Sequence, residues 1–403
     1  MEEWKEYRLG DFMEFNPKIS LKKETVARKI TMDQLVPHSR DIYSWTYELY
    51  SGGSKFQNGD TIMARITPCL ENGKHAFISL LDENEIAYGS TEYIVIRGRK
   101  GISDNLFVYY LTHFPSFKDA AIKSMVGTSG RQRAQVDVLE NLTMKLPSIA
   151  EQKSIADILT KLDDKIAVNK QINDNLEQQA QALFKSWFVD FEPFKDVEFV
   201  ESELGMIPEG WKVVSLSAIA DYINGLAMQK YRPIEGEKGL PVLKIKELGQ
   251  GSTDDNSELC SPSLIGEKYI IDDGDIIFSW SGTLMVKVWC GGKCGLNQHL
   301  FVVEPKDYPH WFAYQWTKHH LDNFIHIAKD KAVTMGHIKR GELDKAKVVV
   351  PDGTSMAAID SMMKPLHRQI ISNNIESRRL AQLRDTLLPS LMSGELKVGD
   401  VTL

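Results

Sequence analysis

The sequence predicts a mixed α/β protein with a pseudo-two-fold internal repeat: two globular domains separated by a pair of long helices that form an antiparallel coiled coil. Three observations predict this fold. The chain repeats itself at an offset of about 205 residues. Each copy begins with short β-rich segments that are divided by Gly, Asn and Asp turns, and each copy ends in a seven-residue repeat of apolar side chains.

The composition is typical of a globular protein. The chain has 403 residues, of which 42% are hydrophobic and 26% are charged, so more than one hydrophobic core is expected. No stretch approaches the roughly 20 apolar residues of a membrane span, and four cysteines are too few for a disulfide framework. We therefore expect a cytoplasmic protein without membrane association. The net charge of -7 argues against a general nucleic-acid coat protein, although local patches could still bind phosphate.

The repeat can be followed through matched segments. Trp4–Leu9 matches Trp211–Leu216, Asn58–Met63 matches Asp273–Phe278, Gly89–Ile96 matches Gly295–Val302, and Leu146–Pro147 matches Val350–Pro351. A two-copy repeat of this length indicates two domains of one type rather than a solenoid. The predicted segments are a first globular domain at 1–147, a central helix with its junction at 148–200, a second globular domain at 201–351, and a C-terminal helix and tail at 352–403.

A long helix is predicted after each globular domain. Ser148 and Glu151 have the spacing of a capping box at the start of the first helix. The positions expected to pair the helices are Ile155, Leu162, Asn169, Leu176 and Leu183 in the first and Ile359, Leu366, Asn373, Leu380 and Leu387 in the second.

Two polar residues share one position of the seven-residue repeat. Asn169 and Asn373 lie where a buried Asn fixes the register of a coiled coil at some cost in stability. In the alternative interpretation, two amphipathic helices pack on their own domains and merely tolerate these side chains. Pro389 is expected to end or kink the second helix near Leu388.

Several enzymatic functions lack their sequence signals. No Gly-rich loop suited to phosphates is present, so a nucleotide or an adenosyl cofactor has no obvious binding loop. Cys290, Cys294, His299 and the distant Cys260 could in principle bind zinc, but their spacing matches no common finger type. Ordinary reduced thiols are the interpretation that we favour, and we expect no metal site.

The central junction and the C-terminal segment carry a family resemblance. The residues concerned are Leu176–Gln179, Leu183–Phe184, Trp187–Phe188, Asp190–Phe191, Gly205–Trp211, Leu380, Leu383–Arg384 and Leu387–Leu396. With two divergent globular halves, each closed by a similar helix, the chain resembles the DNA-specificity (S) subunit of type I restriction-modification systems.

The resemblance implies a noncatalytic subunit. Its two target-recognition domains would each read one half of a split site in double-stranded DNA, and its helices would set the spacer and carry two modification (methyltransferase) subunits. S-adenosylmethionine, ATP and magnesium are then expected on the modification subunits and on the restriction (translocase/endonuclease) subunits, with no cofactor on this chain. A different class of function remains open, namely a coiled-coil adaptor with two protein-binding modules and no nucleic-acid role.

Three loops that recur in both copies are candidates for DNA contact. Base edges are read by Arg, Lys, Asn and Gln, whereas hydroxyl groups and backbone amides bind phosphates. In the first copy the candidates are Arg65 and Thr67, then Ser90, Thr91 and Tyr93, and then Thr128, Ser129, Arg131, Gln132 and Arg133. In the second copy they are Trp280, Ser281 and Thr283, then Asn297, Gln298 and His299, and then Thr334, His337, Lys339 and Arg340. The alternative is ordinary turn chemistry, because Ser, Asn and Gly are common in turns.

Overall fold

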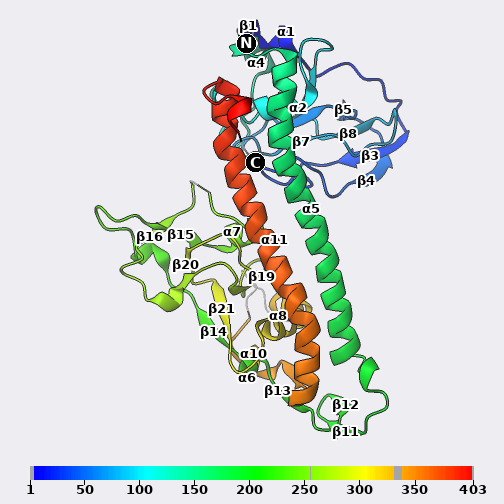
Figure 1. The fold of residues 1–403 in the computed structure, drawn as a ribbon, viewed down its shortest axis with the longest axis vertical. Coiled ribbons are helices and arrows are strands. Elements are labelled where there is room, and N and C mark those ends of the chain that lie inside the picture. The colour runs from blue at the N-terminus through cyan, green and yellow to red at the C-terminus, as the bar shows by residue number, and fades with distance from the viewer. Residues whose placement is uncertain (1–3, 255, 331–337, 402–403) are drawn as a thin grey trace. The chain divides into compact units, whose positions relative to one another are not determined.

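The computed structural model describes residues 4–254, 256–330 and 338–401 (Figure 1). It divides into two compact units. Unit 1 comprises Met1–Ala167 and Leu380–Leu403, and unit 2 comprises Val168–Arg379. Within the described ranges, no helix is both long enough and apolar enough to span a lipid bilayer.

Two helices are far longer than all the others in Figure 1, α5 (Ile149–Phe188) and α11 (Gly353–Ser393). Both were predicted, and α5 begins directly after Ser148. The helix α5 starts in unit 1 and ends in unit 2, whereas α11 starts in unit 2 and ends in unit 1. Each unit therefore contains part of both helices, whereas the sequence had suggested helices separate from the globular domains.

Pro389 does not end the second helix, so the predicted helix end near Leu388 was wrong. The helix α11 continues to Ser393, and Leu388, Leu391 and Met392 are all buried in the core of unit 1. Burial of such side chains contributes about 1.5–3 kcal/mol each. Together they outweigh the cost of a proline in a helix, about 3 kcal/mol.

Unit 1 is a mixed α/β structure. Its sheets have the strand orders β1-β10, β2-β9-β6-β7 and β4-β3-β8-β5, and among the described strands of this unit only β3 and β8 pair in parallel. The strands are β1 (Lys5–Arg8), β2 (Met13–Phe15), β3 (Val26–Ile30), β4 (Thr46–Leu49), β5 (Ser54–Phe56), β6 (Thr61–Ala64), β7 (His75–Phe77), β8 (Ala87–Gly89), β9 (Tyr93–Gly98) and β10 (Thr143–Leu146). The shorter helices are α1 (Leu9–Phe12), α2 (Asn105–Leu111), α3 (Pro115–Lys123), α4 (Val136–Asn141) and, at the end of the chain, the 3-10 helix η4 (Val398–Asp400).

Unit 2 repeats this topology. Its sheets are β13-β22, β14-β21-β18-β19 and β16-β15-β20-β17, with β15 and β20 parallel, and the hairpin β11-β12 precedes them. The strands are β11 (Phe199–Ser202), β12 (Gly205–Pro208), β13 (Lys212–Ser215), β14 (Ala220–Asn224), β15 (Leu240–Leu243), β16 (Leu259–Cys260), β17 (Ile270–Ile271), β18 (Ile276–Ser279), β19 (Met285–Val288), β20 (Cys294–Leu296), β21 (Leu300–Pro305) and β22 (Lys347–Val350). The helices are η1 (Glu192–Phe194), α6 (Leu216–Ile219), η2 (Met228–Lys230), α7 (Ile245–Gln250), η3 (Glu267–Tyr269), α8 (His310–His319), α9 (Leu321–Asp330) and α10 (Gly341–Lys345).

The strand pairing corrects one detail of the sequence repeat. Thr61 of β6 pairs with Ile96, and the equivalent Ile276 of β18 pairs with Val303. Ile96 therefore corresponds to Val303 and not to Val302. A slip of one residue exchanges the two faces of a strand, so the pairing decides between two alignments that look alike in sequence.

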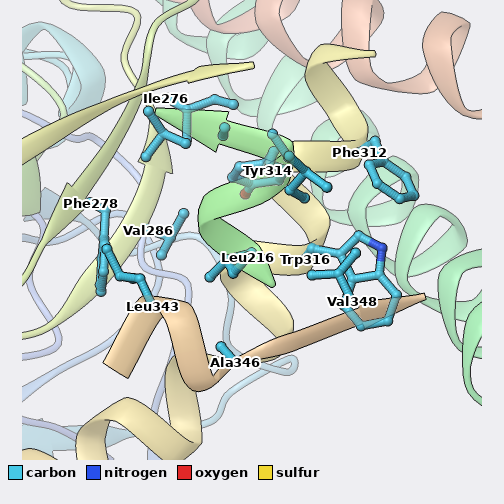
Figure 2. Close-up of a cluster of buried hydrophobic side chains, with 14 of the residues drawn as sticks. Leu216, Ile276, Phe278, Val286, Phe312, Tyr314, Trp316, Leu343, Ala346 and Val348 are labelled. Atoms are coloured by element: carbon cyan, nitrogen blue, oxygen red, sulfur yellow. The ribbon is translucent and has the colours of Figure 1, made fainter. Parts of the chain in front are cut away.

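The central strands β6 and β18 explain why short apolar runs form these sheets. All four residues of each strand are buried, because both faces of the sheet are covered. In unit 1, Met63 packs into one hydrophobic cluster and Ile62 into another. In unit 2, Phe278 joins the cluster of Figure 2, together with Trp316 of α8, whereas Ile277 joins a separate cluster.

Polar contacts join α5 to α11 within each unit. In unit 2 the amide of Asn173 accepts a hydrogen bond from Asn373 at 2.8 Å and donates one to Asn374 at 2.8 Å. Asn169 donates to Glu376 at 2.7 Å. In unit 1 the buried carboxylate of Asp163 accepts hydrogen bonds from Arg384 at 2.6 Å and from Tyr110 at 2.7 Å. In unit 2, Asn169 contacts Glu376 whereas Asn173 contacts Asn373, so the residue numbers run in opposite directions and these two segments are antiparallel.

Candidate nucleic-acid interface

All three candidate loops of unit 1 meet just beyond the end of the central strand β6. The backbone N–H of Arg65 donates to the carbonyl of Glu92 at 2.9 Å, and the N–H of Ala134 donates to the carbonyl of Arg65 at 2.8 Å. The N–H of Thr67 donates to Gln132 at 3.0 Å. Segments that are far apart in sequence thus form one continuous backbone network at this edge of the sheet.

The third loop is closed at its base. Val126 and Arg133 exchange two backbone hydrogen bonds of 3.1 and 2.9 Å, and the N–H of Arg131 donates to Thr128 at 2.9 Å across a turn. Gly130 has a φ of 77°, which the third residue of a type II turn requires. Residues 127–132 therefore form a short tip that projects from a hydrogen-bonded base.

An ion pair fixes the base of this loop. The Arg133 guanidinium donates to the Glu92 carboxylate through Nε at 2.9 Å and Nη2 at 2.7 Å. These hydrogen bonds lower the pKa of Glu92 and raise that of Arg133. Glu92 was not among the predicted site residues. Its position between Thr91 and Tyr93 was the only hint, because sequence cannot show which cation it meets.

The predicted residues of unit 1 differ in accessibility. Thr91, Thr128, Ser129 and Arg131 are exposed, and Arg65, Thr67, Ser90, Gln132 and Arg133 are half-buried. Arg65 is turned inward, since its Nη2 donates to the carbonyl of Ala134 at 3.2 Å. The side chain of Tyr93 is only 2% exposed, packs against Phe56, and has a pKa raised by burial. It lies in the core rather than on the surface of the site.

Unit 2 builds the same arrangement beside the end of β18. The N–H of Trp280 donates to the carbonyl of His299 at 3.4 Å, and the N–H of Ile338 donates to the carbonyl of Trp280 at 3.2 Å. Trp280, His299 and Ile338 thus replace Arg65, Glu92 and Ala134 of unit 1. The side chains differ in kind: Ser281 Oγ lies 3.0 Å from His299 Nδ1, and Trp280 Nε1 donates to Asn224 at 2.9 Å.

The remaining predicted residues of unit 2 differ in accessibility. Thr283, Lys339 and Arg340 are exposed and Gln298 is half-buried, whereas Ser281 and Asn297 are buried. Arg340 Nη2 donates to the carbonyl of Tyr222 at 2.7 Å, so part of its guanidinium is already engaged. Thr334 and His337 lie outside the described residues.

The cysteines of unit 2 are buried thiols. Cys260, Cys290 and Cys294 are each less than a tenth exposed, and burial raises the pKa of Cys290 to about 11 and that of Cys294 to about 12. In the part of the chain that is described, no three His, Cys, Asp or Glu side chains are grouped as a metal ion would require.

The sequence matches a known family over most of its length. The family model described as "Type I restriction modification DNA specificity domain" matches residues 1–178 and 208–382. The chain belongs to this family, and its role is that of a DNA-specificity component of a restriction-modification system. The adaptor alternative is not favoured.

Individual relatives agree with the family match. The chain is 29% identical to the type I restriction enzyme MjaIX specificity subunit of Methanocaldococcus jannaschii, over 73% of this chain and 70% of that protein. It is 24% identical to the HindI specificity subunit of Haemophilus influenzae, over 98% and 100%. The crystal structure of the S subunit of a type I system from M. genitalium has the same fold, with a TM-score of 0.54 and 14% identity over 96% of both chains.

Proposed function

We propose that this chain is a noncatalytic specificity subunit in which each unit reads one half of a bipartite DNA target. The observation that carries the proposal is the repeated site. Three loops meet beyond β6 in unit 1 and beyond β18 in unit 2, held by equivalent backbone hydrogen bonds. Two domains that recognise different DNA sequences require a similar backbone that carries different side chains.

The chemistry of the exposed loop residues supports DNA contact. Arg131 in unit 1 and Lys339 in unit 2 provide cations, and Thr91, Thr128, Ser129 and Thr283 provide hydroxyl groups for phosphates or base edges. The whole chain has a net charge of -7, which opposes a broad nonspecific interaction with DNA. We infer that partner subunits supply part of the phosphate-binding surface.

We further propose that α5 and α11 pair as an antiparallel coiled coil, relate the two halves by a pseudo-two-fold axis, and set the spacer between the half-sites. Ile155, Leu162 and Ile359 are buried, and Leu176, Leu183, Leu366, Leu380 and Leu387 are partly buried. The hydrogen bonds of Asn169 and Asn373 support a role in fixing the register. In this proposal the target-recognition domains span 1–147 and 201–351, and the helical regions span 148–200 and 352–403.

The partners follow from the same assignment. We propose that the chain binds double-stranded DNA, two modification (methyltransferase) subunits and, through the complex, restriction subunits. S-adenosylmethionine, ATP and magnesium would then be bound by those partners, and this chain would contribute recognition and assembly without an active site. The names of the relatives, all of them specificity subunits of type I restriction enzymes, support this division.

The test of the proposed function is selection from a library of random duplex DNA. The full chain should be assembled with its modification subunits and compared with the modification subunits alone at two salt concentrations, because nonspecific binding falls steeply with salt. We expect the complex to enrich a bipartite sequence with a fixed spacer. Enrichment of no sequence, with binding that disappears at the higher salt, would reject the proposal and favour the adaptor.

The spacer role has a separate test. Inserting seven residues after Asn169 and seven after Asn373 preserves the apolar repeat and lengthens each helix by about 10 Å. At about 3.4 Å per base pair, the selected spacer should grow by roughly 3 base pairs, with weaker binding because one half-site is also rotated. If binding stays tight and the spacer keeps its original length, the helices do not set the distance.

A further inference from the structure

We propose that the two arginines at the third loop of unit 1 have different roles: Arg131 reads a guanine in the major groove, whereas Arg133 positions the loop through Glu92. This inference rests on the proposed function and assigns the chemistry within one half-site. Both arginines are predicted DNA contacts by residue type, and only their surroundings separate them.

Arg131 lies on the tip of the loop. Its backbone N–H closes the turn at Thr128, so the backbone is held while the side chain is exposed. Among the described residues, its guanidinium forms no hydrogen bond or ion pair, and the residue is exposed. Gly127 contributes to this geometry, because a Cβ added there would lie 2.7 Å from the carbonyl oxygen of Arg131. The backbone of the tip is therefore a tight turn from which the side chain of Arg131 extends.

Arg133 lies at the base of the loop. Its backbone bonds to Val126, and its Nε and Nη2 are both used by the Glu92 carboxylate. The remaining Nη1 lies 3.4 Å from the carbonyl oxygen of Arg131, so the same side chain also contacts the tip. With Glu92 on its Nε–Nη2 edge, Arg133 has only its Nη1–Nη2 edge left for DNA, and Nη1 is already directed at the carbonyl oxygen of Arg131.

This difference determines which arginine can read a base. An arginine that recognises guanine donates in a bidentate manner to O6 and N7, which requires two adjacent free N–H groups. Arg131 has both edges of its guanidinium available, whereas Glu92 occupies one edge of Arg133 and holds its side chain at the base of the loop. The charges of Glu92 and Arg133 cancel, so the base of the loop has no net charge from this pair. The tip keeps the positive charge of Arg131. The first half-site should consequently contain one G·C pair whose selection depends on Arg131.

The test uses the full chain with its modification subunits and the same random duplex library. The variants are Arg131→Ala, Arg131→Lys, Arg133→Ala and Arg133→Lys. Lys100→Ala is the control, because it removes one exposed cation of unit 1 beyond the opposite end of β9. Selected sequences, total affinity and the midpoint of thermal unfolding are measured for each protein.

For Arg131→Ala we expect the preference for guanine to fall about 10- to 100-fold at a single position, with the other half-site unchanged. Arg131→Lys should lose the same preference and keep more of the total affinity, because lysine retains the charge but lacks the two adjacent N–H donors of the guanidinium. Arg133→Ala should weaken selection across several positions of the same half-site, and Arg133→Lys, which can still pair with Glu92, should largely restore it. The midpoint of thermal unfolding of every variant should match that of the parent. Lys100→Ala should also select the parental consensus.

Other results would overturn the assignment. If Arg131→Ala keeps the guanine preference while Arg133→Ala loses it at one position, the roles are reversed. If neither variant changes the consensus of a parent complex that does select a bipartite site, the loop is not the reader although the proposed function stands. A parent complex that selects no site would instead count against the proposed function itself.

Discussion

Units 1 and 2 share one topology but use different polar chemistry at equivalent places. At the end of the central strand, unit 1 joins its loops with the ion pair of Glu92 and Arg133, whereas unit 2 has Trp280 and His299 there. Asp163 of α5 forms a buried ion pair with Arg384, and the equivalent position of α11 is His367, whose Nε2 lies 2.7 Å from His310 Nδ1. The apolar pattern determines the shared backbone, and the polar positions are free to diverge.

The largest effect that distinguishes the units is expected at Asp163. Replacing it by Ala removes the buried carboxylate from the Arg384 guanidinium, which is only 9% exposed, and leaves it only the exposed carboxylate of Asp385 at 2.8 Å. Removing one partner of a buried pair costs about 3–5 kcal/mol. Hydrogen exchange of the unit 1 amides should detect that loss without a comparable change in unit 2.

The matched control for Asp163 is Asp157→Ala on the same helix. Asp157 pairs with Lys161 at 2.7 Å, but both side chains are more than half exposed. Its loss should cost less than about 1 kcal/mol. Equal effects of the two substitutions would show that the buried pair of unit 1 contributes no more than a surface pair.

The second prediction is that acid destabilises unit 2 through protonation of His367. Burial, together with the neighbouring His310, lowers the pKa of His367 to about 4, and Glu177 opposes this shift. The folded pKa lies below the unfolded value, so the stabilisation is complete above about pH 6.5 and is lost as the pH falls toward 4. We expect this one group to reduce the free energy of unfolding by about 2 kcal/mol between pH 7 and pH 5.

Denaturation of His367→Gln and of the parent at both pH values checks this prediction. The glutamine side chain at position 367 cannot titrate, so the free energy of unfolding of the variant should change about 2 kcal/mol less between the two pH values. The exposed His326 provides the control, since His326→Gln should keep the parental dependence. An unchanged dependence in His367→Gln would mean that other groups cause the acid sensitivity of unit 2.

The smallest effect is expected at the unit 1 site itself. Glu92 and Arg133 have side chains that are 24% and 42% exposed, so solvent screens their attraction. Glu92→Gln should change the free energy of unfolding by less than about 1 kcal/mol in a chemical denaturation experiment. A cost of several kcal/mol would instead show that the pair stabilises the fold substantially.

The sequence predicted the repeat, the long helices and three loops that recur in both copies, because these depend on apolar periodicity and on turn residues, but it did not predict that the loops meet. It did not predict that α11 continues through Pro389, because that depends on tertiary burial. It also could not separate Arg131 from Arg133, or exclude Tyr93 from the surface. Those distinctions depend on which side chain from another strand lies within hydrogen-bonding distance, and neither residue type nor spacing carries that information.

The central claim is that each unit reads its own half of the target. The most direct measurement is DNA selection by the full complex after Gln298 and Lys339 of unit 2 are replaced by Ala. We predict that only the second half-site changes its consensus, while the first half-site and the spacer match those of the parent. Simultaneous change of both half-sites, or a parental consensus in both, would contradict the claim.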